Sequence, residues 1–228
     1  MKLFKIKGGV HPDDCKTLTA KRSIETLPLP KLLHIPLQQH IGSPAAAVVR
    51  RGEQVKKGQL LAHSQGMISA PVHAPTSGRV VGVGSYPAHH ASGLSVRTIT
   101  LKPDGREQWL DTSATPADPF TLPPEEIATR VAAAGIVGMG GAAFPSHVKL
   151  SLPEGVAIRH LLINGAECEP YLTTDHRVML EHPGDVMSGI RFLMRAVGAP
   201  RTIIAVESNK PDAAEALRAA IPPQAPIT

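Results

Sequence analysis

A glycine-rich stretch, residues 135–149, constrains this chain more than any other. It reads Gly-Ile-Val-Gly-Met-Gly-Gly-Ala-Ala-Phe-Pro-Ser-His-Val-Lys, with three glycines in four positions at Gly138, Gly140 and Gly141. Ordering a glycine costs more backbone entropy than ordering any other residue, so this cluster disfavours a helix or strand interior. A loop without Cβ atoms can instead present successive backbone N–H groups to an anion or a flat ring. The stretch, which ends at Lys149, therefore predicts a ligand-binding loop.

The elements on either side of this loop are also predictable. Residues 124–134 form a helix by pattern, since proline and acidic residues occupy its first turn and Gly135 follows its end. Residues 156–163 are mostly apolar and predict a buried strand, which leads into the acidic turn Asn164-Gly-Ala-Glu167-Cys-Glu169-Pro. We expect the glycine loop and this acidic turn to face one another across a ligand.

Two other interpretations of the glycine loop stay open at this point. Gly138-x-Gly140-x-x-Ala143 fits a loose dinucleotide-binding fingerprint, but that motif needs a strand before the glycines and a helix after them. Here the residues before the glycines predict a helix, whereas the dinucleotide motif needs a strand at that place. A tight glycine corner that binds nothing is the other alternative.

The composition of the 228 residues is that of a globular protein, with 42% hydrophobic and 19% charged residues. No apolar run approaches the roughly 18–20 residues that a membrane-spanning helix needs, and the N-terminus lacks the apolar core of a signal peptide. We therefore expect a cytoplasmic protein without a membrane span of its own. Cys15 and Cys168 are too few for the four thiolates of an iron–sulfur cluster, and we expect both to be ordinary reduced thiols.

Charge is unevenly distributed along the chain. Residues 1–110 contain 15 Lys and Arg against 6 Asp and Glu, whereas residues 111–228 contain 9 against 13. This asymmetry suggests two modules, of which the basic one either docks on an acidic partner or anionic lipid surface or simply carries a solvated basic face. Nucleic acid is a poor candidate partner, because aromatic residues for base stacking make up only 3% of the chain.

The N-terminal half divides into an arm, residues 1–30, and an all-β module, residues 31–102. Pro-rich and turn-forming residues predict that the arm wraps over a neighbouring surface. In the module, short β-prone runs alternate with turn signals, which is typical of a compact sandwich or barrel. The β-prone runs are residues 32–37, 46–49, 59–62 and 79–83.

Two phrases of this module, residues 49–61 and 73–80, resemble the biotinyl/lipoyl-type barrel-sandwich hybrid. Carrier domains of that fold attach their cofactor to a lysine between these phrases, but residues 59–77 contain no lysine. A swinging cofactor arm is therefore not expected, and the module should be structural or a docking platform. The histidines in and near it, His63, His73 and the pair His89-His90, lack the spacing of a zinc site and are predicted to be loop histidines.

Residues 103–123 are rich in Pro, Ser and Thr and predict a linker, so we place the domain boundary there. Residues 124–228 alternate helix and strand, which predicts a parallel α/β sheet with ligands at the carboxyl ends of its strands. The predicted later elements are helices at 176–180, 185–197 and 212–220 and a strand at 201–206, with an apolar helix face at Val186, Ile190, Leu193, Met194 and Val197. Two strands make an incomplete sheet, so we expect this domain to be truncated.

Several unusual strings, in order along the chain, resemble the N-terminal part of the C subunit of Rnf/Rsx ion-translocating electron-transport complexes. They are residues 8–12, 33–42, 55–59, 72–78, 138–145, 164–170 and 207–211. The second half is also similar to the NADH-binding flavoprotein subunit of respiratory complex I, which has a related glycine loop and acidic turn. The resemblance implies a barrel-sandwich hybrid domain followed by part of an α/β domain that binds FMN and NAD(H).

The resemblance also implies roles for individual residues. Gly138, Gly140 and Gly141 would lie against FMN with Lys149 near the flavin or its phosphate, and Asn164, Glu167 and Glu169 would line the flavin and the nicotinamide side. No side chain is expected to act as a catalytic acid or base, since hydride transfer belongs to the two cofactors. No resident metal ion is expected. Ala166 stands where the complex I turn has aspartate, and the two [4Fe-4S] cluster motifs of the family are not in these 228 residues.

Two functions follow from the resemblance. The first is a peripheral subunit at the cytoplasmic face of the bacterial inner membrane, which joins other subunits in electron transfer between NAD(H) and ferredoxin or another acceptor, such as a redox regulator, coupled to ion translocation. On this hypothesis the isolated chain is inactive. The second is a docking or assembly module whose flavin site is incomplete. The direction of electron flow and the ion translocated do not follow from the sequence.

Overall fold

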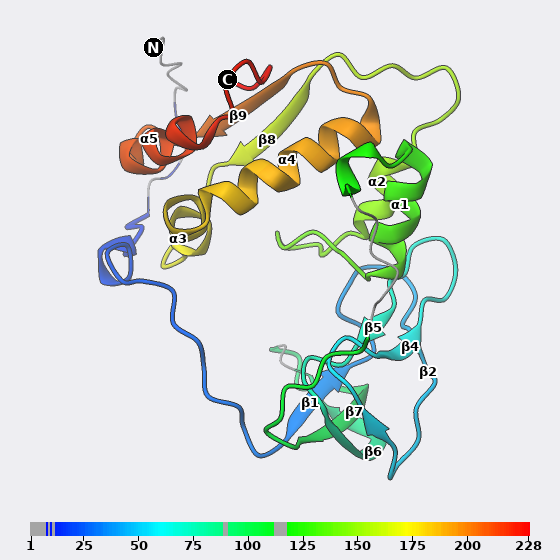
Figure 1. The fold of residues 1–228 in the computed structure, drawn as a ribbon. Coiled ribbons are helices and arrows are strands. Elements are labelled where there is room, and N and C mark those ends of the chain that lie inside the picture. The colour runs from blue at the N-terminus through cyan, green and yellow to red at the C-terminus, as the bar shows by residue number, and fades with distance from the viewer. Residues whose placement is uncertain (1–7, 9, 11, 89–90, 112–117) are drawn as a thin grey trace. The chain divides into compact units, whose positions relative to one another are not determined.

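The computed structural model describes residues 8, 10, 12–88, 91–111 and 118–228 (Figure 1). Contacts divide the chain into two compact units: residues 27–157 with 195–198, and residues 1–26 with 158–194 and 199–228. We call them the sandwich unit and the parallel-sheet unit. Residues 124–157 thus cluster with the sandwich, whereas the predicted domain boundaries at 31–102, 103–123 and 124–228 stay predictions. His89, His90 and residues 112–117 of the predicted linker lie outside the described residues.

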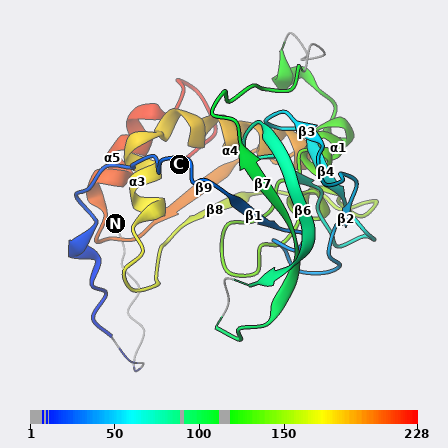
Figure 2. The ribbon, with the colours of Figure 1, turned by 90° about the horizontal axis from the view of Figure 1, so that it is seen from below.

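The sandwich unit contains two antiparallel sheets, and its longest strands, β6 and β7, run side by side (Figure 2). One sheet has the order β1-β7-β6-β3 and the other β2-β4-β5. The strands are β1 (Leu33–Pro36), β2 (Ala46–Ala47), β3 (Gln54–Val55), β4 (Leu60–His63), β5 (Val72–His73), β6 (Gly78–Pro87) and β7 (Ser95–Pro103). This architecture confirms the all-β prediction for the module.

A single apolar core joins the two sheets of the sandwich unit. Leu61 of β4, Val80 of β6 and Ile99 and Leu101 of β7 are completely buried and belong to one hydrophobic cluster. Strand β7 is absent from the predicted strands, although it lies between β1 and β6. Its β-branched residues, Val96, Thr98, Ile99 and Thr100, are the sequence signal that would have found it.

The first part of the predicted linker packs onto the sandwich. The Lys57 backbone N–H donates to the Gln108 carbonyl at 2.8 Å, and the Leu110 N–H donates to the Lys57 carbonyl at 2.9 Å. The Lys57 ammonium bonds the Glu107 carboxylate and lies 5.2 Å from the centroid of the Trp109 ring. Residues 107–110 of the predicted linker are therefore held on the sandwich unit by the backbone and side chain of Lys57, and the role of residues 103–123 as a domain boundary stays a prediction.

The predicted first helix is present as α1 (Pro124–Ala133) and ends as its glycine predicts. Gly135 has φ +69°, and its N–H and that of Ile136 return to the Ala132 and Val131 carbonyls. A Cβ on Gly135 would lie 2.4 Å from the Pro71 carbonyl oxygen next to β5. Backbone conformation and close packing both require glycine here, and this contact places the glycine loop beside the sandwich. A short helix, α2 (Ser146–Leu150), follows the loop.

The parallel-sheet unit contains the predicted two-stranded parallel sheet. Strand β8 (Leu161–Gly165) pairs with β9 (Thr202–Val206) in parallel, from Leu161↔Thr202 to Gly165↔Val206. Strand β8 begins five residues later than predicted, and its side chains alternate in exposure, with Leu162 65% exposed. The prediction of a fully buried strand is therefore wrong, because only one face of the sheet is covered.

Three helices complete this unit: α3 (Thr174–Glu181), α4 (Pro183–Val197) and α5 (Pro211–Ala220). Their apolar faces form a core with the covered side of the sheet, in which Met187 and Ile190 of α4 are buried and Val186 and Met194 pack at its edge. The predicted apolar face of α4 is confirmed for Val186, Ile190 and Met194. The helices α4 and α5 begin at Pro183 and Pro211, since proline fits the first helical turn.

The N-terminal segment packs on the parallel-sheet unit, as an arm would. The Tyr171 N–H donates to the Asp14 carbonyl at 2.7 Å, and the Ile24 N–H donates to the Glu181 carboxylate at 3.1 Å. A 3-10 turn, η1 (Lys16–Leu18), lies between these contacts. None of the helices in the described ranges has the length and apolar content to cross a membrane.

Candidate functional site

A cavity of about 860 Å³ lies in the sandwich unit beside the glycine loop. One wall is the loop itself, from Ala134 to Ala143, and the other comes from β5 and the segment around His40. The volume is within the roughly 300–1,000 Å³ of small-molecule and cofactor sites. The predicted loop therefore borders a space large enough for a cofactor, and all lining residues belong to one compact unit.

The backbone N–H groups of the loop are only partly used by the protein. The Gly138 N–H donates to the Phe144 carbonyl at 2.8 Å, and the Ala143 N–H donates to the Gly140 carbonyl at 3.0 Å, which closes the loop. Among the described residues, no acceptor is present for the N–H groups of residues 139–142. These four successive residues line one side of the cavity, and their N–H groups remain available to an anion or a heterocycle.

The glycines of the loop are not required by the loop's own geometry. Gly138, Gly140 and Gly141 are not among the residues with positive φ. A Cβ on Gly140 or Gly141 would meet no atom within 4 Å, and one on Gly138 would make only ordinary contacts, at 3.6 Å. Neither a left-handed backbone nor crowding requires glycine at these three positions, so the loop has room for an external group to approach its backbone.

Lys149 lies on α2, immediately after the loop. It is exposed, and its ammonium lies 5.7 Å from the centroid of the Phe144 ring, the aromatic residue that closes the loop. This cation–π contact holds the charge near the loop without neutralising it. Lys149 thus remains an exposed cation beside the loop, and its cofactor role stays a prediction.

The acidic turn belongs to the parallel-sheet unit, at the carboxyl end of β8. Asn164 is exposed, and its side-chain oxygen accepts the Ala166 N–H at 3.0 Å, which shapes the turn. Glu169 is exposed. Because the glycine loop belongs to the other unit, the expectation that the two face one another across a ligand stays a prediction, as do the cofactor roles of Asn164, Glu167 and Glu169.

Glu167, which the resemblance places beside the flavin and the nicotinamide, has most of its partners within its own unit. It is 2% exposed, and its carboxylate accepts the Asp175 N–H at 2.7 Å and the Thr174 hydroxyl at 3.3 Å, which caps α3. The other oxygen lies 3.7 Å from the Lys16 ammonium and, within the described part of the chain, has no hydrogen-bond partner. Lys16 also bonds the Glu167 and Leu172 carbonyls. This carboxylate therefore organises its own unit.

A second charged group lies at the same edge of the parallel sheet, after β9. The Lys210 ammonium is 3% exposed and pairs with the Glu207 carboxylate. Burial acts to raise the pKa of Glu207, but hydrogen bonds from Lys210 and from the Glu167 backbone outweigh it and hold that pKa below its usual value. Burial and the nearby Glu167 and Glu169 carboxylates raise the pKa of Asp175. The sequence did not point to Lys16 as part of this charged group, because its partner Glu167 lies 151 residues further along the chain.

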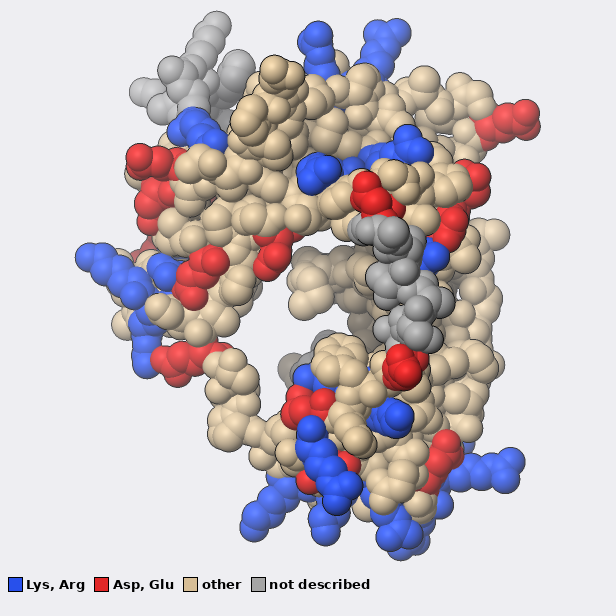
Figure 3. Space-filling view, viewed as in Figure 1, with Lys and Arg blue, Asp and Glu red and all other residues tan. Residues whose placement is uncertain are grey.

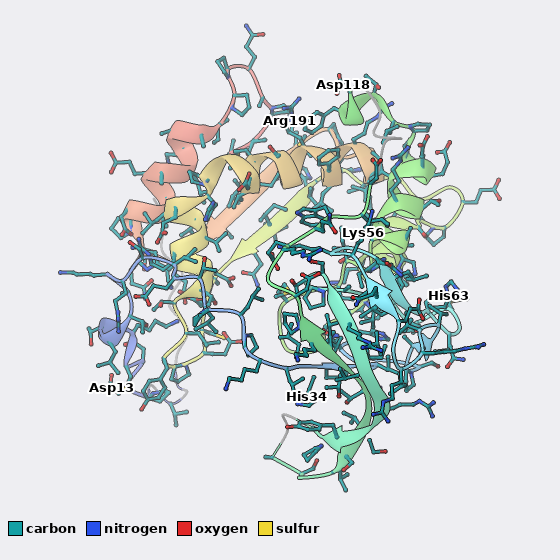
Figure 4. The ribbon with its side chains drawn as sticks, turned by 60° about the horizontal axis from the view of Figure 1, so that its bottom comes forward. Asp13, His34, Lys56, His63, Asp118 and Arg191 are labelled. Atoms are coloured by element: carbon teal, nitrogen blue, oxygen red, sulfur yellow. The ribbon has the colours of Figure 1, made fainter. Side chains whose placement is uncertain are left out.

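The prediction that the histidines of the sandwich unit are loop residues is wrong for two of them. His63 and His73 are the last residues of β4 and β5. His63 is exposed and His73 is half-buried at the cavity (His63 is labelled in Figure 4). Among the described residues, no three His, Cys, Asp or Glu side chains converge as a metal site would require.

The sequence matches two families of domains. Residues 4–106 match the model of the RnfC barrel sandwich hybrid domain, and residues 131–226 match that of the Nuo51 FMN-binding domain. The fold class is therefore a barrel-sandwich hybrid followed by a flavin-domain type of α/β structure, as the sequence predicted.

Curated relatives match this chain across both domains. The C subunit of the ion-translocating oxidoreductase complex of Rhodobacter capsulatus is 53% identical over 94% of this chain, which covers 41% of that relative. The C subunit of the proton-translocating ferredoxin:NAD(+) oxidoreductase complex of Clostridium ljungdahlii is 43% identical over 96% of the chain and 47% of the relative. The chain is thus homologous to the C subunits of ion-translocating oxidoreductase complexes and spans somewhat less than half of their length.

A solved NAD+-reducing [NiFe]-hydrogenase is similar over 47% of this chain and 20% of its own, at 30% identity and a TM-score of 0.42. A TM-score this low adds nothing to the assignment.

Proposed function

We propose that this chain is the part of such a C subunit that binds FMN at the glycine loop and takes part in electron transfer between NAD(H) and a ferredoxin-type acceptor. In the whole protein this transfer is coupled to ion translocation, and two [4Fe-4S] clusters lie outside the 228 residues. The complex is held at the cytoplasmic face of the bacterial inner membrane through its other subunits. The chain alone is inactive in that transfer.

The observation that carries this proposal is the row of unpartnered N–H groups at residues 139–142 beside a cofactor-sized cavity. Backbone donors suit both the acceptor atoms of an isoalloxazine and the negative charge that the ring gains on reduction. FMN supplies the hydride and electron chemistry when it is bound. The protein's own part is to hold the ring against the loop glycines and to offer the charge of Lys149.

The decisive experiment is a titration of the purified chain with FMN, in which the change in flavin fluorescence reports binding. We expect saturable binding of FMN. Gly141→Val, which the fold tolerates because no atom lies within 4 Å of the new Cβ, should weaken FMN binding tenfold or more. Gly189→Val, at a helical glycine of α4 with equal free space, is the matched control. Absence of FMN binding, or equal effects of the two variants, contradicts the proposal.

A second candidate function is a docking module without a working flavin site. The observation that favours it is the exposed basic group formed by Arg50, Arg51 and Lys56 on the sandwich unit. Such a group suits an acidic protein partner or an anionic membrane surface. The two functions are compatible in one protein, since the basic group and the cavity use different residues.

A further inference from the structure

The part of the cavity lining that β5 supplies contains a histidine, His73, whose ring is not used by the fold. His73 ends β5, and its Nδ1 lies 3.4 Å from the position of a Cβ on Gly135, the residue that leads into the loop. Within the described part of the chain, neither ring nitrogen has a hydrogen-bond partner. Burial lowers the pKa of His73, so its neutral ring offers one donor and one acceptor at neutral pH.

The other histidine of this wall is already committed to the fold. His40 is 7% exposed, and its two ring nitrogens lie 3.1 Å from the carbonyl oxygens of Ile41 and Ala70. The Ala70 N–H also points to the same ring. His40 therefore connects two segments of the sandwich, whereas His73 is the ring that remains available to a ligand.

The charge of the cavity narrows the kind of ligand group that His73 can contact. The described residues that line the cavity include no Asp, Glu, Lys or Arg. An uncharged wall of amides, small apolar side chains and a neutral imidazole does not balance a phosphate dianion. It suits a flat, neutral heterocycle that has both hydrogen-bond donors and acceptors.

We infer that His73 is a binding residue of the sandwich unit that hydrogen-bonds the ring of the flavin held at the glycine loop. This inference rests on the proposed function. It makes the barrel-sandwich hybrid a wall of the flavin site in addition to a structural or docking module. The ring lies between the glycine loop and β5, and the phosphate lies away from His73.

The test compares FMN with riboflavin, which has the same ring and no phosphate. His73→Phe keeps a ring of similar size without hydrogen bonds, and one lost hydrogen bond should weaken the binding of both flavins by about tenfold. His73→Gln, which restores a donor and an acceptor, should recover part of this loss. His63→Phe, at the exposed end of the neighbouring strand, is the matched control and should change neither affinity. NMR of the labelled His73 imidazole should show a shift when riboflavin is added.

Each other result overturns the inference in a distinguishable way. Weaker binding of FMN alone would place the phosphate, and not the ring, at His73. Unchanged binding of both flavins by His73→Phe, with weaker binding by Gly141→Val, would remove His73 from the site and leave the proposed function intact. If the unaltered chain binds neither flavin, or if neither variant matters, both the proposed function and this inference fail.

Discussion

At the scale of single residues, the glycines around the loop fall into two kinds. Gly135 has a positive φ and no room for a Cβ beside Pro71. Gly140 and Gly141 have neither constraint. The first kind is required by the fold, whereas the second is not, and we propose that it keeps a surface clear for a ligand.

Stability measurements can separate these two kinds. Gly135→Ala should lower the free energy of unfolding by about 1–3 kcal/mol, because the new Cβ meets a carbonyl oxygen and the backbone is left-handed. Gly140→Ala should change it by no more than about 0.5 kcal/mol. Urea denaturation followed by circular dichroism measures both. Equal losses would show that the loop glycines are also structural.

Two aspartates lie in the first turns of their helices. Replacing each with asparagine should change the stability of the protein at neutral pH in opposite directions. Burial and the Glu167 carboxylate raise the pKa of Asp175 on α3, so its ionised form destabilises the fold once the pH exceeds its ordinary value. Asp175→Asn should therefore stabilise the protein slightly at neutral pH and lose this gain in acid. The α3 terminus keeps the Glu167 carboxylate as its cap.

Asp212 on α5 is the matched control. Burial acts to raise its pKa, but hydrogen bonds from the Ala213 N–H and from His176 outweigh it, so the pKa is lowered. Its carboxylate contributes stability above the ordinary pKa and loses it as the pH falls through the lowered value. Asp212→Asn should destabilise slightly at neutral pH. Thermal unfolding measured from neutral to acid pH checks both variants. If the two substitutions shift the melting temperature in the same direction, the opposite pKa shifts of Asp175 and Asp212 are refuted.

At the scale of elements, the N-terminal segment is an integral part of the parallel-sheet unit. Lys16 reaches the acidic turn with two carbonyl contacts and the Glu167 ion pair, and only 10% of its side chain is exposed. Arg177 of α3 holds the same segment through the Ala20 carbonyl at 3.2 Å. The conformation of the turn thus depends on residues that precede the sandwich in the chain.

Removal of the Lys16 ammonium should destabilise one unit more than the other. Lys16→Met leaves the Glu167 carboxylate buried without its cation, which typically costs about 3–5 kcal/mol. The double variant with Glu167→Gln should regain part of this loss. Trp109, the single tryptophan, lies in the sandwich unit and reports on that unit by fluorescence.

The expected signature is a separation of the two unfolding signals. The circular dichroism transition of Lys16→Met should move to lower urea, while the Trp109 fluorescence transition stays in place. A shift of both transitions by the same amount would mean that the two units unfold as one cooperative structure.

At the scale of the whole molecule, the charge asymmetry separates the two halves of the chain. Lys and Arg side chains project from the sandwich unit, as in the lower part of Figure 3. Arg50, Arg51 and Lys56 are exposed, whereas the Lys57 ammonium is paired with Glu107. The unpaired cations are the ones available to an acidic partner.

Charge reversal tests whether this basic group docks the protein on its complex. The triple variant Arg50→Glu, Arg51→Glu and Lys56→Glu should weaken co-purification with the membrane subunits of the complex, most strongly at low salt. A control triple reversal at the exposed Arg159, Arg201 and Arg218 of the parallel-sheet unit changes net charge equally. A similar loss of co-purification in both triple variants would mean that net charge alone is responsible. No loss in the variant of Arg50, Arg51 and Lys56 would rule out a docking role for this basic group.

Features set by neighbouring residues were predictable from the sequence. Helix α1 and its end at Gly135, strand β9, and the apolar face of α4 follow from proline position, glycine position and periodicity, which act within a few residues. The glycine loop was likewise identified as a surface without Cβ atoms. Such signals are local, so the residues alone contain them.

Features that depend on partners distant in the chain needed the tertiary structure. Strand β7 takes its central place from β1 and β6, and residues 107–110 pack because Lys57 supplies their partners. Glu167 is buried by a lysine 151 residues before it, and His73 borders the cavity because Gly135 packs beside β5. Residue types determined which groups can bind a ligand, whereas long-range packing decided which of them are left unpaired to do so.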